Sequence, residues 1–335
     1  MILIDADVLG RARTGDETYV SNLLRELPRV APDLRFAAVT RRPELVPDGV
    51  EAIRLATPLQ ELRMAWTLPR LLRRLRPDLA HFQHALPLGF RGRSVVTLHD
   101  LSFESDSAAM GRLDRLVFRT FVPRAARRAD AVLVVSERTR RDVEERYGIE
   151  PAKVTVTPNG VDPSFTPGPS GDGYLLFVGA IQRRKNPLAA LAAARAVGLP
   201  LVVAGPEKEP ALARELRDGG ADLRGYVSKH ELAELYRGAA ALVLPSRFEG
   251  FGLPVLEAMA CGTPVVAAPE PALREVAGDV AVYADDGDFG AAVARALAER
   301  ERLSAAGVAR ARLFSWEETA RRTAEVYRRV LEVQV

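Results

Sequence analysis

The stretch LVLPSRFEGFGLPVLEAMACGTP, residues 242–264, decides the fold class of this chain. An apolar strand ends at Pro245, a loop with two glycines follows, and a helix begins with Pro254 at its first position and ends at Gly262. Glycines let the backbone approach a ligand closely, and the free N–H groups of a helix start bind anions. This order predicts an α/β sheet whose loop holds a phosphate or diphosphate.

The same alternation of short β-branched runs and longer helical patterns continues along the chain, which is typical of βαβ units on a parallel sheet. The strands predicted in the first half are residues 2–7, 35–40, 50–55, 79–83, 94–98, 130–135 and 154–157. The strands predicted in the second half are residues 174–179, 201–204, 223–227, 241–244, 264–267 and 280–283. The sequence therefore predicts two α/β domains of the Rossmann type.

A proline- and glycine-rich segment separates the two halves. Residues 157–173 contain four Pro and four Gly in seventeen positions, so they continue neither a helix nor a central strand. We place the domain boundary there. Because open parallel sheets bind ligands beyond the carboxyl ends of their strands, the functional residues are expected in loops that follow strands.

Composition excludes several classes of protein. The 335 residues carry 47 Lys and Arg against 44 Asp and Glu, a near-neutral balance from which we expect no nucleic-acid partner. The single Cys261 excludes an internal disulfide framework. The first apolar run contains two carboxylates, unlike a signal peptide, and no uncharged apolar stretch reaches the roughly 18 residues that span a bilayer. We expect a cytoplasmic protein.

Two carboxylates accompany the glycine loop. Glu249 lies in the loop and Glu257 in the helix, eight residues further on. Because Glu249 precedes the helix, both side chains can face one ligand. Acidic residues are common near helix starts in any protein, so the alternative is a helix-start charge and a solvated loop charge. The strand, the glycines and the proline together favour a functional pair.

Cations follow another predicted strand, in YLLFVGAIQRRKNP at residues 174–187. Arg183, Arg184 and Lys185 beside a helix start would suit a diphosphate leaving group, with Arg giving bidentate contacts and Lys a point charge. The alternative is a solvated basic loop. Lys185 is one of only four lysines in the chain, which favours a specific role.

In the first half, His99 and Asp100 end the predicted strand SVVTLHD, where an imidazole could contact a substrate hydroxyl or a developing charge. A histidine satisfied by local hydrogen bonds is the alternative. The segment TGDETY, residues 14–19, follows the first strand and opens a helix, a position where backbone N–H groups meet phosphate.

Together these segments resemble the retaining glycosyltransferases of the GT-B fold in family 4, also called glycosyl transferases group 1. Glu249 and Glu257, with GFGLP between them, match the E-x7-E signature that is the family's most specific mark. The other matches are His99-Asp100 in VTLHDL, VTPNGVD at 156–162, Arg184-Lys185-Asn186 and FSWE at 314–317. The resemblance covers nearly the whole chain.

The resemblance implies two Rossmann-like domains that face a central cleft. It implies an N-terminal acceptor-binding domain over residues 1–165 and a C-terminal domain over residues 172–312 that binds the sugar nucleotide. Residues 313–335 would include a helix, expected over 316–330, that crosses back onto the N-terminal domain.

The resemblance also implies roles for individual residues. Glu249 and His99 would be the catalytic residues at the transferred sugar, and Glu257 would accept hydrogen bonds from the ribose. The other donor-binding residues would be Gly15, Arg184, Lys185, Tyr226, Val227, Gly250, Phe251, Gly252 and Leu253. The acceptor side would include Asp16 and Asp100.

Two positions depart from the family pattern. Members with this opening usually carry an aliphatic residue where this chain has Asp16, so we expect Asp16 to turn toward the acceptor. Ala180 stands where many members carry Arg, so neutralisation of the diphosphate should fall on Arg184 and Lys185.

The DAD at residues 5–7 could be a metal-binding pair, but Asp5 lies within a strand and no other ligands cluster nearby. We expect no metal and no cofactor.

Basic charge concentrates in residues 62–76 and 110–128, each with apolar residues between its arginines. Basic amphipathic helices can lie on anionic membranes, although apolar helix faces are more often core. Peripheral contact with the inner face of a membrane is therefore one interpretation, and protein core is the other.

The resemblance implies transfer of a mannose- or glucose-type hexose from a nucleoside diphosphate sugar, with GDP or UDP as the carrier. The acceptor would be a hydroxyl of a glycan, a lipid-linked saccharide or a small molecule. The alternatives are a non-catalytic sugar-nucleotide binding protein and a GT-B nucleotide-sugar epimerase. A phosphorylase would need a lysine for pyridoxal phosphate, and none of the four lysines lies in a suitable C-terminal helix.

Overall fold

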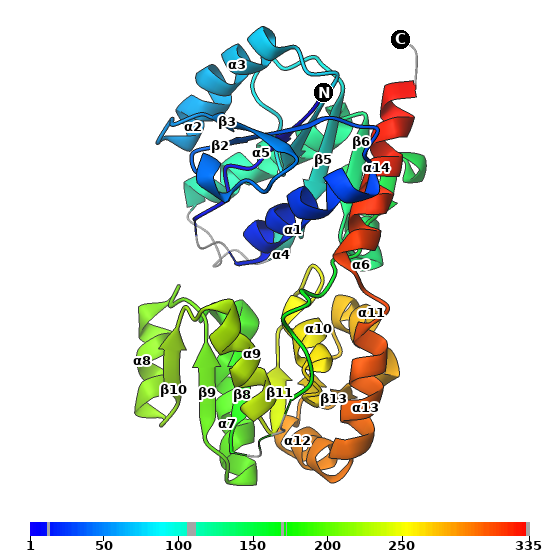
Figure 1. Ribbon diagram of the computed structural model, residues 1–335. Helices are drawn as coiled ribbons and strands as arrows, with labels where there is room; N and C mark the ends of the chain where they lie inside the picture. Colours follow the sequence, from blue (N-terminus) through cyan, green and yellow to red (C-terminus); the bar gives the residue numbers. More distant parts are fainter. Residues whose placement is uncertain (12–13, 106–111, 169–170, 172, 333–335) are drawn as a thin grey trace. The chain divides into compact units, whose positions relative to one another are not determined.

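The computed structural model describes residues 1–11, 14–105, 112–168, 171 and 173–332. Met110, Asp172 and Val335, which limit predicted segments, lie outside these ranges. The contacts divide the chain into two compact units, residues 1–160 with 316–335, and residues 161–315 (Figure 1).

Unit 1 is built on a seven-stranded parallel sheet. In spatial order its strands are β3 (Val50–Arg54), β2 (Phe36–Thr40), β1 (Ile2–Asp5), β4 (Leu79–Gln83), β5 (Ser94–Leu98), β6 (Ala131–Val134) and β7 (Val154–Val156). Its helices are α1 (Thr14–Val30), α2 (Gln60–Leu62), α3 (Leu68–Leu75), α4 (Ser102–Ser105), α5 (Arg112–Arg128), α6 (Glu137–Tyr147) and α14 (Trp316–Glu332). A π-helical turn, Arg63–Thr67, joins α2 to α3.

Unit 2 repeats the plan on six parallel strands. In spatial order they are β10 (Asp222–Gly225), β9 (Leu201–Ala204), β8 (Leu175–Val178), β11 (Ala241–Leu244), β12 (Val265–Ala267) and β13 (Val282–Tyr283). Its helices are α7 (Pro187–Val197), α8 (Pro210–Asp218), α9 (Lys229–Gly238), α10 (Leu253–Ala260), α11 (Pro271–Ala277), α12 (Phe289–Ala298) and α13 (Arg300–Ala311).

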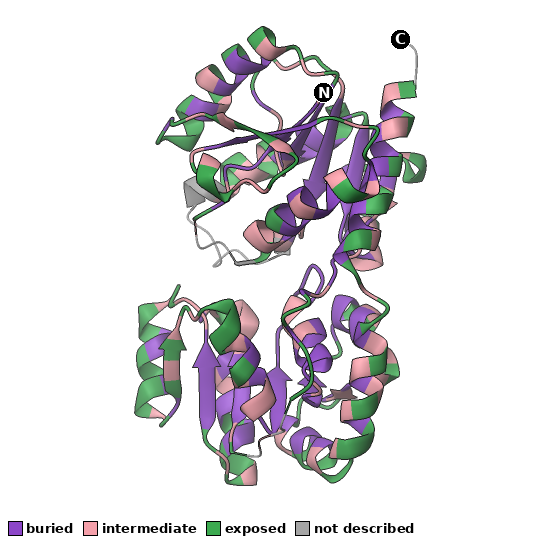
Figure 2. Cartoon of the chain, viewed as in Figure 1, coloured by how far each residue is buried: buried purple, intermediate pink, exposed green. Residues whose placement is uncertain are grey.

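Both units bury their central strands and expose the outer sides of their helices, whereas the edge strands β3 and β10 are largely exposed (Figure 2). The central strands are apolar without alternation, as expected for sheets covered on both faces. Two Rossmann-like parallel sheets are thus confirmed. In each unit the strand order reverses next to the first strand, between β1 and β4 and between β8 and β11. Loops at such reversals bind ligands in this architecture.

The last helix belongs to the first unit. α14 packs against α1, and its Tyr327 hydroxyl lies 2.6 Å from Nδ1 of His81 in β4. Nε2 of His81 lies 2.7 Å from the Thr97 hydroxyl in β5, which lies 3.1 Å from the Tyr19 hydroxyl of α1. This buried polar chain ties four elements together, because every member would be costly to bury without a partner. The predicted return of the C-terminal helix is confirmed.

Candidate active site

The centre of the site in unit 2 is an ion pair between the two segments highlighted in the sequence. Nζ of Lys185 lies 2.5 and 2.7 Å from the two carboxylate oxygens of Glu249. Lys185 ends a 3₁₀ turn after β8, and Glu249 lies in the loop after β11. Both side chains are largely buried, which makes the pair expensive to form unless its charges serve a ligand or each other.

Arg184 holds these two loops in register. Its Nη1 donates to the carbonyl of Phe248 at 2.5 Å, and its own carbonyl accepts the N–H of Arg247. Its Nε is buried without a hydrogen-bond partner among the described residues, as is the hydroxyl of Ser246. Buried donors normally have a partner, so these two atoms are available to a polar ligand or to water. Sequence analysis singled out Arg184 but missed Ser246, which lacks a motif of its own.

Three glycines end neighbouring strands of unit 2. Gly179 follows β8, Gly205 follows β9 and Gly225 ends β10, each with a positive φ. The backbones of Gly179 and Gly205 approach so closely that a Cβ on Gly205 would lie 2.1 Å from the Gly179 carbonyl oxygen. Because these glycines carry no side chains, a ligand could contact the protein backbone at the carboxyl edge of the sheet. Gly205 was missed because a lone glycine is a weak signal.

We expect Gly205→Ala to destabilise unit 2 by about 1–3 kcal/mol, because both the clash and the φ of +147° oppose a side chain. Gly198→Ala is the matched control, since Gly198 has a φ of +69° but no atom within 4 Å of its Cβ position. Urea unfolding followed by circular dichroism measures the difference. Equal losses in the two variants would show that the close approach contributes nothing.

The loop before α10 presents backbone rather than side chains. Gly252, the N-cap of α10, has a φ of 105°, and a Cβ there would meet Leu273 at 2.6 Å. Phe251 is buried with its ring edge against Phe314. Together with Gly250, these residues leave the N–H groups of Gly252 and Leu253 at the start of a helix, where anions bind. The Phe251 ring is therefore engaged in packing within unit 2.

Glu257 lies one turn into α10 and accepts a hydrogen bond from the Tyr236 hydroxyl at 2.9 Å. Burial raises its pKa to about 7, against the opposing effects of Tyr236 and Lys229. Burial also raises the pKa of Tyr236. A carboxyl that titrates near neutrality marks a functional position more often than a structural one. Tyr236 was not predicted, because its helix pattern indicates core.

Tyr226 and Val227 follow β10, as predicted. The Tyr226 side chain is 62% exposed, which fits a ring left available for a ligand. Nearby, Lys229 binds the Asp162 carboxylate at 2.5 Å and so contributes to the charge around Glu257. Asp162 belongs to the VTPNGVD segment.

In unit 1, His99 follows β5 and is mostly buried. Its Nε2 lies 3.0 Å from Oε1 of Gln83, and its ring meets the edge of Tyr19 at a centroid distance of 4.7 Å. Burial, aided by His84, lowers its pKa to about 4, so the imidazole is neutral at pH 7. A neutral imidazole can accept or donate a hydrogen bond to a sugar hydroxyl.

His84 and Asp16 join His99. The Asp16 carboxylate lies 3.7 Å from Nε2 of His84 and 4.0 Å from Nε2 of His99. His84 adopts a φ of +62°, which is costly for a residue with a side chain and is common at functional sites. Sequence analysis missed His84, because nothing in HFQHALP marks a left-handed residue. Asp16 was predicted on the acceptor side.

The two remaining predicted residues in unit 1 lie at or just before helix starts. Asp100 accepts hydrogen bonds from the backbone N–H and hydroxyl of Ser102, which begins α4. Gly15 lies in the first turn of α1, with no atom within 4 Å of its Cβ position and no positive φ. Gly15 is exposed, and nothing in the backbone around it requires glycine.

The DAD segment is part of an arginine network. Nη1 and Nη2 of Arg63, which is fully buried, donate to the Asp5 carboxylate at 2.9 and 2.6 Å. Arg41 makes a bidentate pair with Asp7 at 2.8 and 3.0 Å. Arg63 belongs to the basic segment 62–76 for which membrane contact was one interpretation, but the π-helical turn directs its side chain inward to the carboxylates of Asp5 and Asp7.

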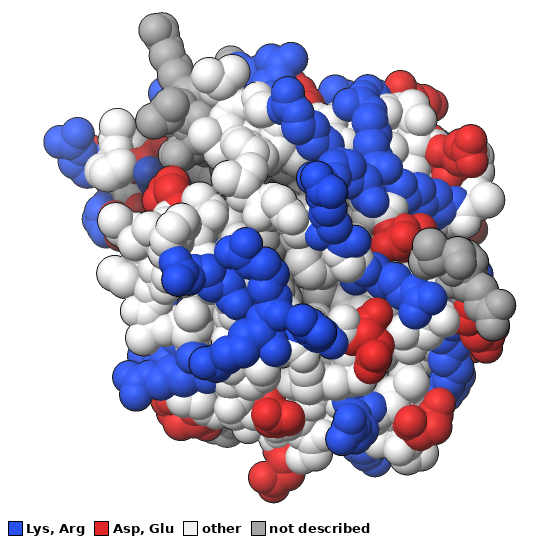
Figure 3. Space-filling model, turned by 90° about the horizontal axis from the view of Figure 1, so that it is seen from above, with Lys and Arg blue, Asp and Glu red and all other residues white. Residues whose placement is uncertain are grey.

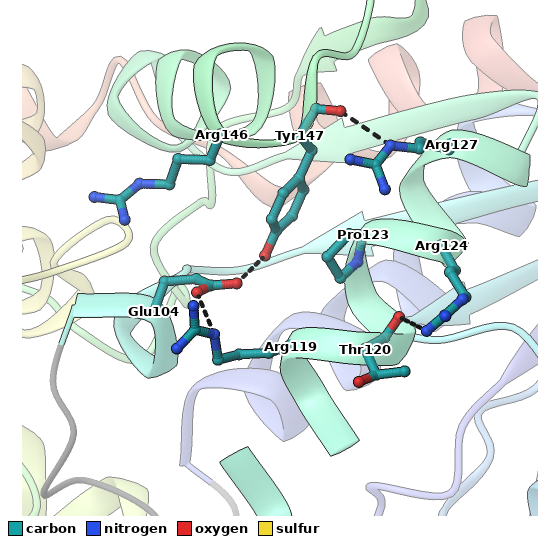
Figure 4. Close-up of a pocket in the computed structure, with 8 residues that line it drawn as sticks. All are labelled: Glu104, Arg119, Thr120, Pro123, Arg124, Arg127, Arg146 and Tyr147. Carbon is teal, nitrogen blue, oxygen red and sulfur yellow. Dashed lines mark hydrogen bonds and ion pairs between the residues drawn. The ribbon is translucent and has the colours of Figure 1, made fainter. Parts of the chain in front are cut away.

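A polar hollow of about 510 Å³ lies between α5 and α6 (Figure 4). Its lining residues are Glu104, Arg119, Thr120, Pro123, Arg124, Arg127, Arg146 and Tyr147. Both oxygens of Glu104 are engaged, one by Arg119 Nε at 3.0 Å and one by the Tyr147 hydroxyl at 3.3 Å. Four arginines and one carboxylate line the hollow, and Arg146 also pairs with Asp142, so the lining carries a net positive charge.

Apolar side chains are exposed on the same helix. Leu116, Val117 and Phe121 of α5 are exposed, whereas Phe118 packs on Phe103. Lys and Arg side chains also gather in connected patches on the surface seen in Figure 3. No helix among the described residues is long and apolar enough to cross a membrane.

Comparison with known proteins identifies the family. Residues 13–165 match the model of Glycosyltransferase Family 4, and residues 162–309 match that of Glycosyl transferases group 1. The O-antigen chain mannosyltransferase B of Escherichia coli is 29% identical over 326 residues, covering 88% of this chain and 83% of the relative. A D-inositol 3-phosphate glycosyltransferase of Actinosynnema mirum is 32% identical, covering 76% and 70%. Several other proteins of that name match over little more than half of their length.

A solved structure shows the same fold. Sucrose-phosphate synthase from Thermosynechococcus elongatus superimposes with a TM-score of 0.78 over 99% of both chains, at 23% identity. The two family models together extend over both units, and each unit carries its share of the E-x7-E and HD motifs. The chain is therefore a glycosyltransferase of family 4, glycosyl transferases group 1, with the GT-B fold.

Proposed function

We propose that the protein is a retaining hexosyltransferase whose unit 2 binds a nucleoside diphosphate sugar. The observation that carries this proposal is the buried Lys185–Glu249 pair beside the unpartnered Nε of Arg184. Lys185 and Arg184 would neutralise the diphosphate, helped by the N–H groups of Gly252 and Leu253, and Glu249 would contact the sugar. Each well-placed donor of this kind is worth about 3 kcal/mol of barrier.

The chemistry follows from the charges. The bond between the anomeric carbon and the diphosphate oxygen breaks, and the acceptor oxygen bonds to the same face of the sugar. The acceptor proton goes to the departing diphosphate oxygen. Glu249 is paired with a lysine and not with a second carboxylate, whereas a double displacement of the glycosidase type uses two carboxylates about 5 Å apart. This arrangement favours same-face transfer.

The acceptor side belongs to unit 1 in this proposal. His99 would bind the transferred sugar through its neutral ring, and Asp16, His84 and Asp100 would lie toward the acceptor hydroxyl. We propose GDP or UDP as the carrier and mannose as the first sugar to test, since one relative is named a mannosyltransferase. The acceptor would be a glycan, as that relative's name indicates for its own substrate, or a lipid-linked saccharide.

Turnover tests the proposal. The protein would be incubated with GDP-mannose, UDP-glucose and related donors, with and without acceptors, and released nucleotide and anomeric configuration would be followed by NMR. We expect nucleotide release that depends on acceptor and yields the donor's own anomeric configuration. Inversion would exclude the retaining mechanism, and conversion of one sugar nucleotide into another without release would favour the epimerase alternative.

Donor affinity should rise with pH through Glu257. Its pKa of about 7 means that the carboxyl is mostly protonated at pH 6 and mostly ionised at pH 8. Only the ionised form accepts two ribose hydroxyls, so the donor Kd should fall about tenfold over this range. The stability of the free protein should change in the opposite direction. Because the pKa of Glu257 is higher in the folded than in the unfolded state, its ionisation lowers the free energy of unfolding as the pH rises from about 4.5 to about 7.

Calorimetric titration of GDP or UDP at pH 6, 7 and 8 measures this dependence. Glu257→Gln should bind more weakly at pH 8 and show a flat profile. A wild-type profile as flat as that of Glu257→Gln would contradict the role of Glu257. Glu215→Gln, on the outer face of α8, is the control.

We further propose that α5 rests on an anionic membrane. Exposed Leu116, Val117 and Phe121 next to the arginine-lined hollow combine apolar insertion with attraction for lipid phosphates. An arginine near an anionic surface contributes about 1 kcal/mol, or about fivefold in affinity, and Phe121 adds its buried area.

Vesicle flotation checks this proposal. The wild type should float with vesicles that contain phosphatidylglycerol and not with pure phosphatidylcholine, and Phe121→Ser with Arg124→Gln should lower binding more than about fivefold. Leu313→Ser with Arg302→Gln, a pair of exposed residues in unit 2, is the control. If both double variants lost vesicle binding equally, α5 would not be the membrane-binding face.

A further inference from the structure

Three side chains of unit 1 converge on one point from three elements. Asp16 comes from the first turn of α1, His84 from the loop after β4 and His99 from the end of β5. Their ligand atoms all lie within 4.8 Å of one another. The sequence places them far apart, and the costly left-handed backbone of His84 keeps its ring in the cluster.

We propose that Asp16, His84 and His99 form a binding site for a divalent transition-metal ion of the zinc type. Two imidazoles and one carboxylate are the donor set that proteins use for Zn²⁺, Fe²⁺ and Co²⁺, and three protein ligands leave an exchangeable position. Among the described residues this is the one group of three or more such side chains close enough to share an ion.

The distances are close to those of a loaded site. Bonds of about 2.0–2.1 Å in a tetrahedron place neighbouring ligand atoms about 3.3 Å apart. The Asp16 oxygens lie 3.7 Å from Nε2 of His84 and 4.0 Å from Nε2 of His99. Because all the ligand atoms lie within 4.8 Å of one another, shifts of about 1 Å at each side chain would close the site, which rotation about side-chain bonds supplies.

Binding would displace one existing contact. Nε2 of His99 lies against Oε1 of Gln83, and the Gln83 amide nitrogen is buried without a partner among the described residues. When the metal binds Nε2 of His99, the Gln83 side chain loses this contact. In its present position only the amide oxygen has a partner, and the amide nitrogen has none among the described residues. The exchange therefore costs one hydrogen bond of ordinary strength.

Occupation would inhibit transfer. A metal on His99 removes the ring nitrogen that the proposed function assigns to the sugar, so zinc should lower turnover while donor binding in unit 2 stays intact. This part of the inference rests on the proposed function, whereas binding of the ion does not. Turnover in the presence of a chelator should be undiminished.

The chain suits a direct test because it has only four histidines and one cysteine. Cys261 is buried, His81 is enclosed between Thr97 and Tyr327, and His230 is exposed on α9. Metal-free protein would be titrated with Zn²⁺ by calorimetry and with Co²⁺ by visible absorption. We expect one ion per chain and visible bands of Co²⁺ in a four- or five-coordinate site.

Asp16→Asn and His84→Gln should each weaken binding by about tenfold or more, since even supporting residues of metal sites cost that much when changed. His230→Gln should leave binding unchanged. Failure of the wild type to bind, unchanged affinity in both ligand variants, or loss of binding in His230→Gln would overturn the proposal. Thermal unfolding checks that each variant is folded, and if one is not, the other decides. If no donor supports turnover, the titration still reads out the metal site, so the two proposals fail separately.

Discussion

Glu249→Gln should lower kcat about 10²–10³-fold, with donor affinity changed much less. The amide keeps the shape of the carboxylate but removes the charge that Lys185 holds 2.5 Å away, and a lost preorganised charge at a reacting centre costs this much. Measurement of kcat and KM with saturating acceptor separates the two effects.

Lys185 and Glu249 should behave as one unit. Lys185→Met alone leaves a buried carboxylate without its cation and also removes a diphosphate contact, so both kcat and donor affinity should fall. Because each residue acts through the other, the double variant Lys185→Met with Glu249→Gln should show a much smaller fall in kcat than the product of the falls in the two single variants. Glu215→Gln on exposed α8 is the control. A kcat of Glu249→Gln within threefold of wild type would refute the assigned role.

Arg63→Met should destabilise unit 1 by about 3–5 kcal/mol. The guanidinium is fully buried against Asp5, and removal of one partner leaves the other charge buried and unpaired. At about 2–4 °C per kcal/mol for a unit of this size, the midpoint of unfolding should fall by roughly 10 °C. Both tryptophans, Trp66 and Trp316, belong to unit 1, so tryptophan fluorescence reports its unfolding selectively.

A compensating variant tests the cause. Arg63→Met with Asp5→Asn removes both charges and should recover more than half of the loss, because an apolar side chain paired with a neutral amide leaves no unpaired ion. Arg73→Met, on the exposed side of α3, should change stability by less than about 0.5 kcal/mol. Equal destabilisation in the single and double variants would mean that packing around Arg63, and not its charge, is responsible.

Most of the sheet architecture could be predicted from the sequence. All thirteen predicted strands occur within about two residues, because buried parallel strands are continuous β-branched runs between turn residues. The helix after Glu249 was expected to begin at Pro254 and begins at Leu253, since Gly252 serves as N-cap. Arg63 shows the limit. Its burial depends on Asp5 and Asp7, more than fifty residues earlier, and a local basic pattern cannot encode that contact.

The site was partly predictable for a similar reason. Lys185 and Glu249 were each indicated by a loop motif after a strand, and neighbouring strands of a parallel sheet bring such loops together. The motifs did not predict that Lys185 and Glu249 pair directly with each other. His84 and Gly205 escaped because their roles arise from a backbone conformation and a close approach between strands. Both properties belong to tertiary structure and leave no spacing in the sequence.

The path of α14 has a consequence for biosynthesis. Tyr19 touches both His99 and Trp316, the first residue of α14, and Tyr327 closes the polar chain beneath the sheet. The first unit to leave the ribosome is therefore the last to be completed, because residues 316–332 are made after all of unit 2. Unit 2 is continuous and can fold during translation. Until α14 has been synthesised, the nascent unit 1 exposes the face of α1 that this helix covers. Tyr19, which packs against His99, then lacks its contact with Trp316.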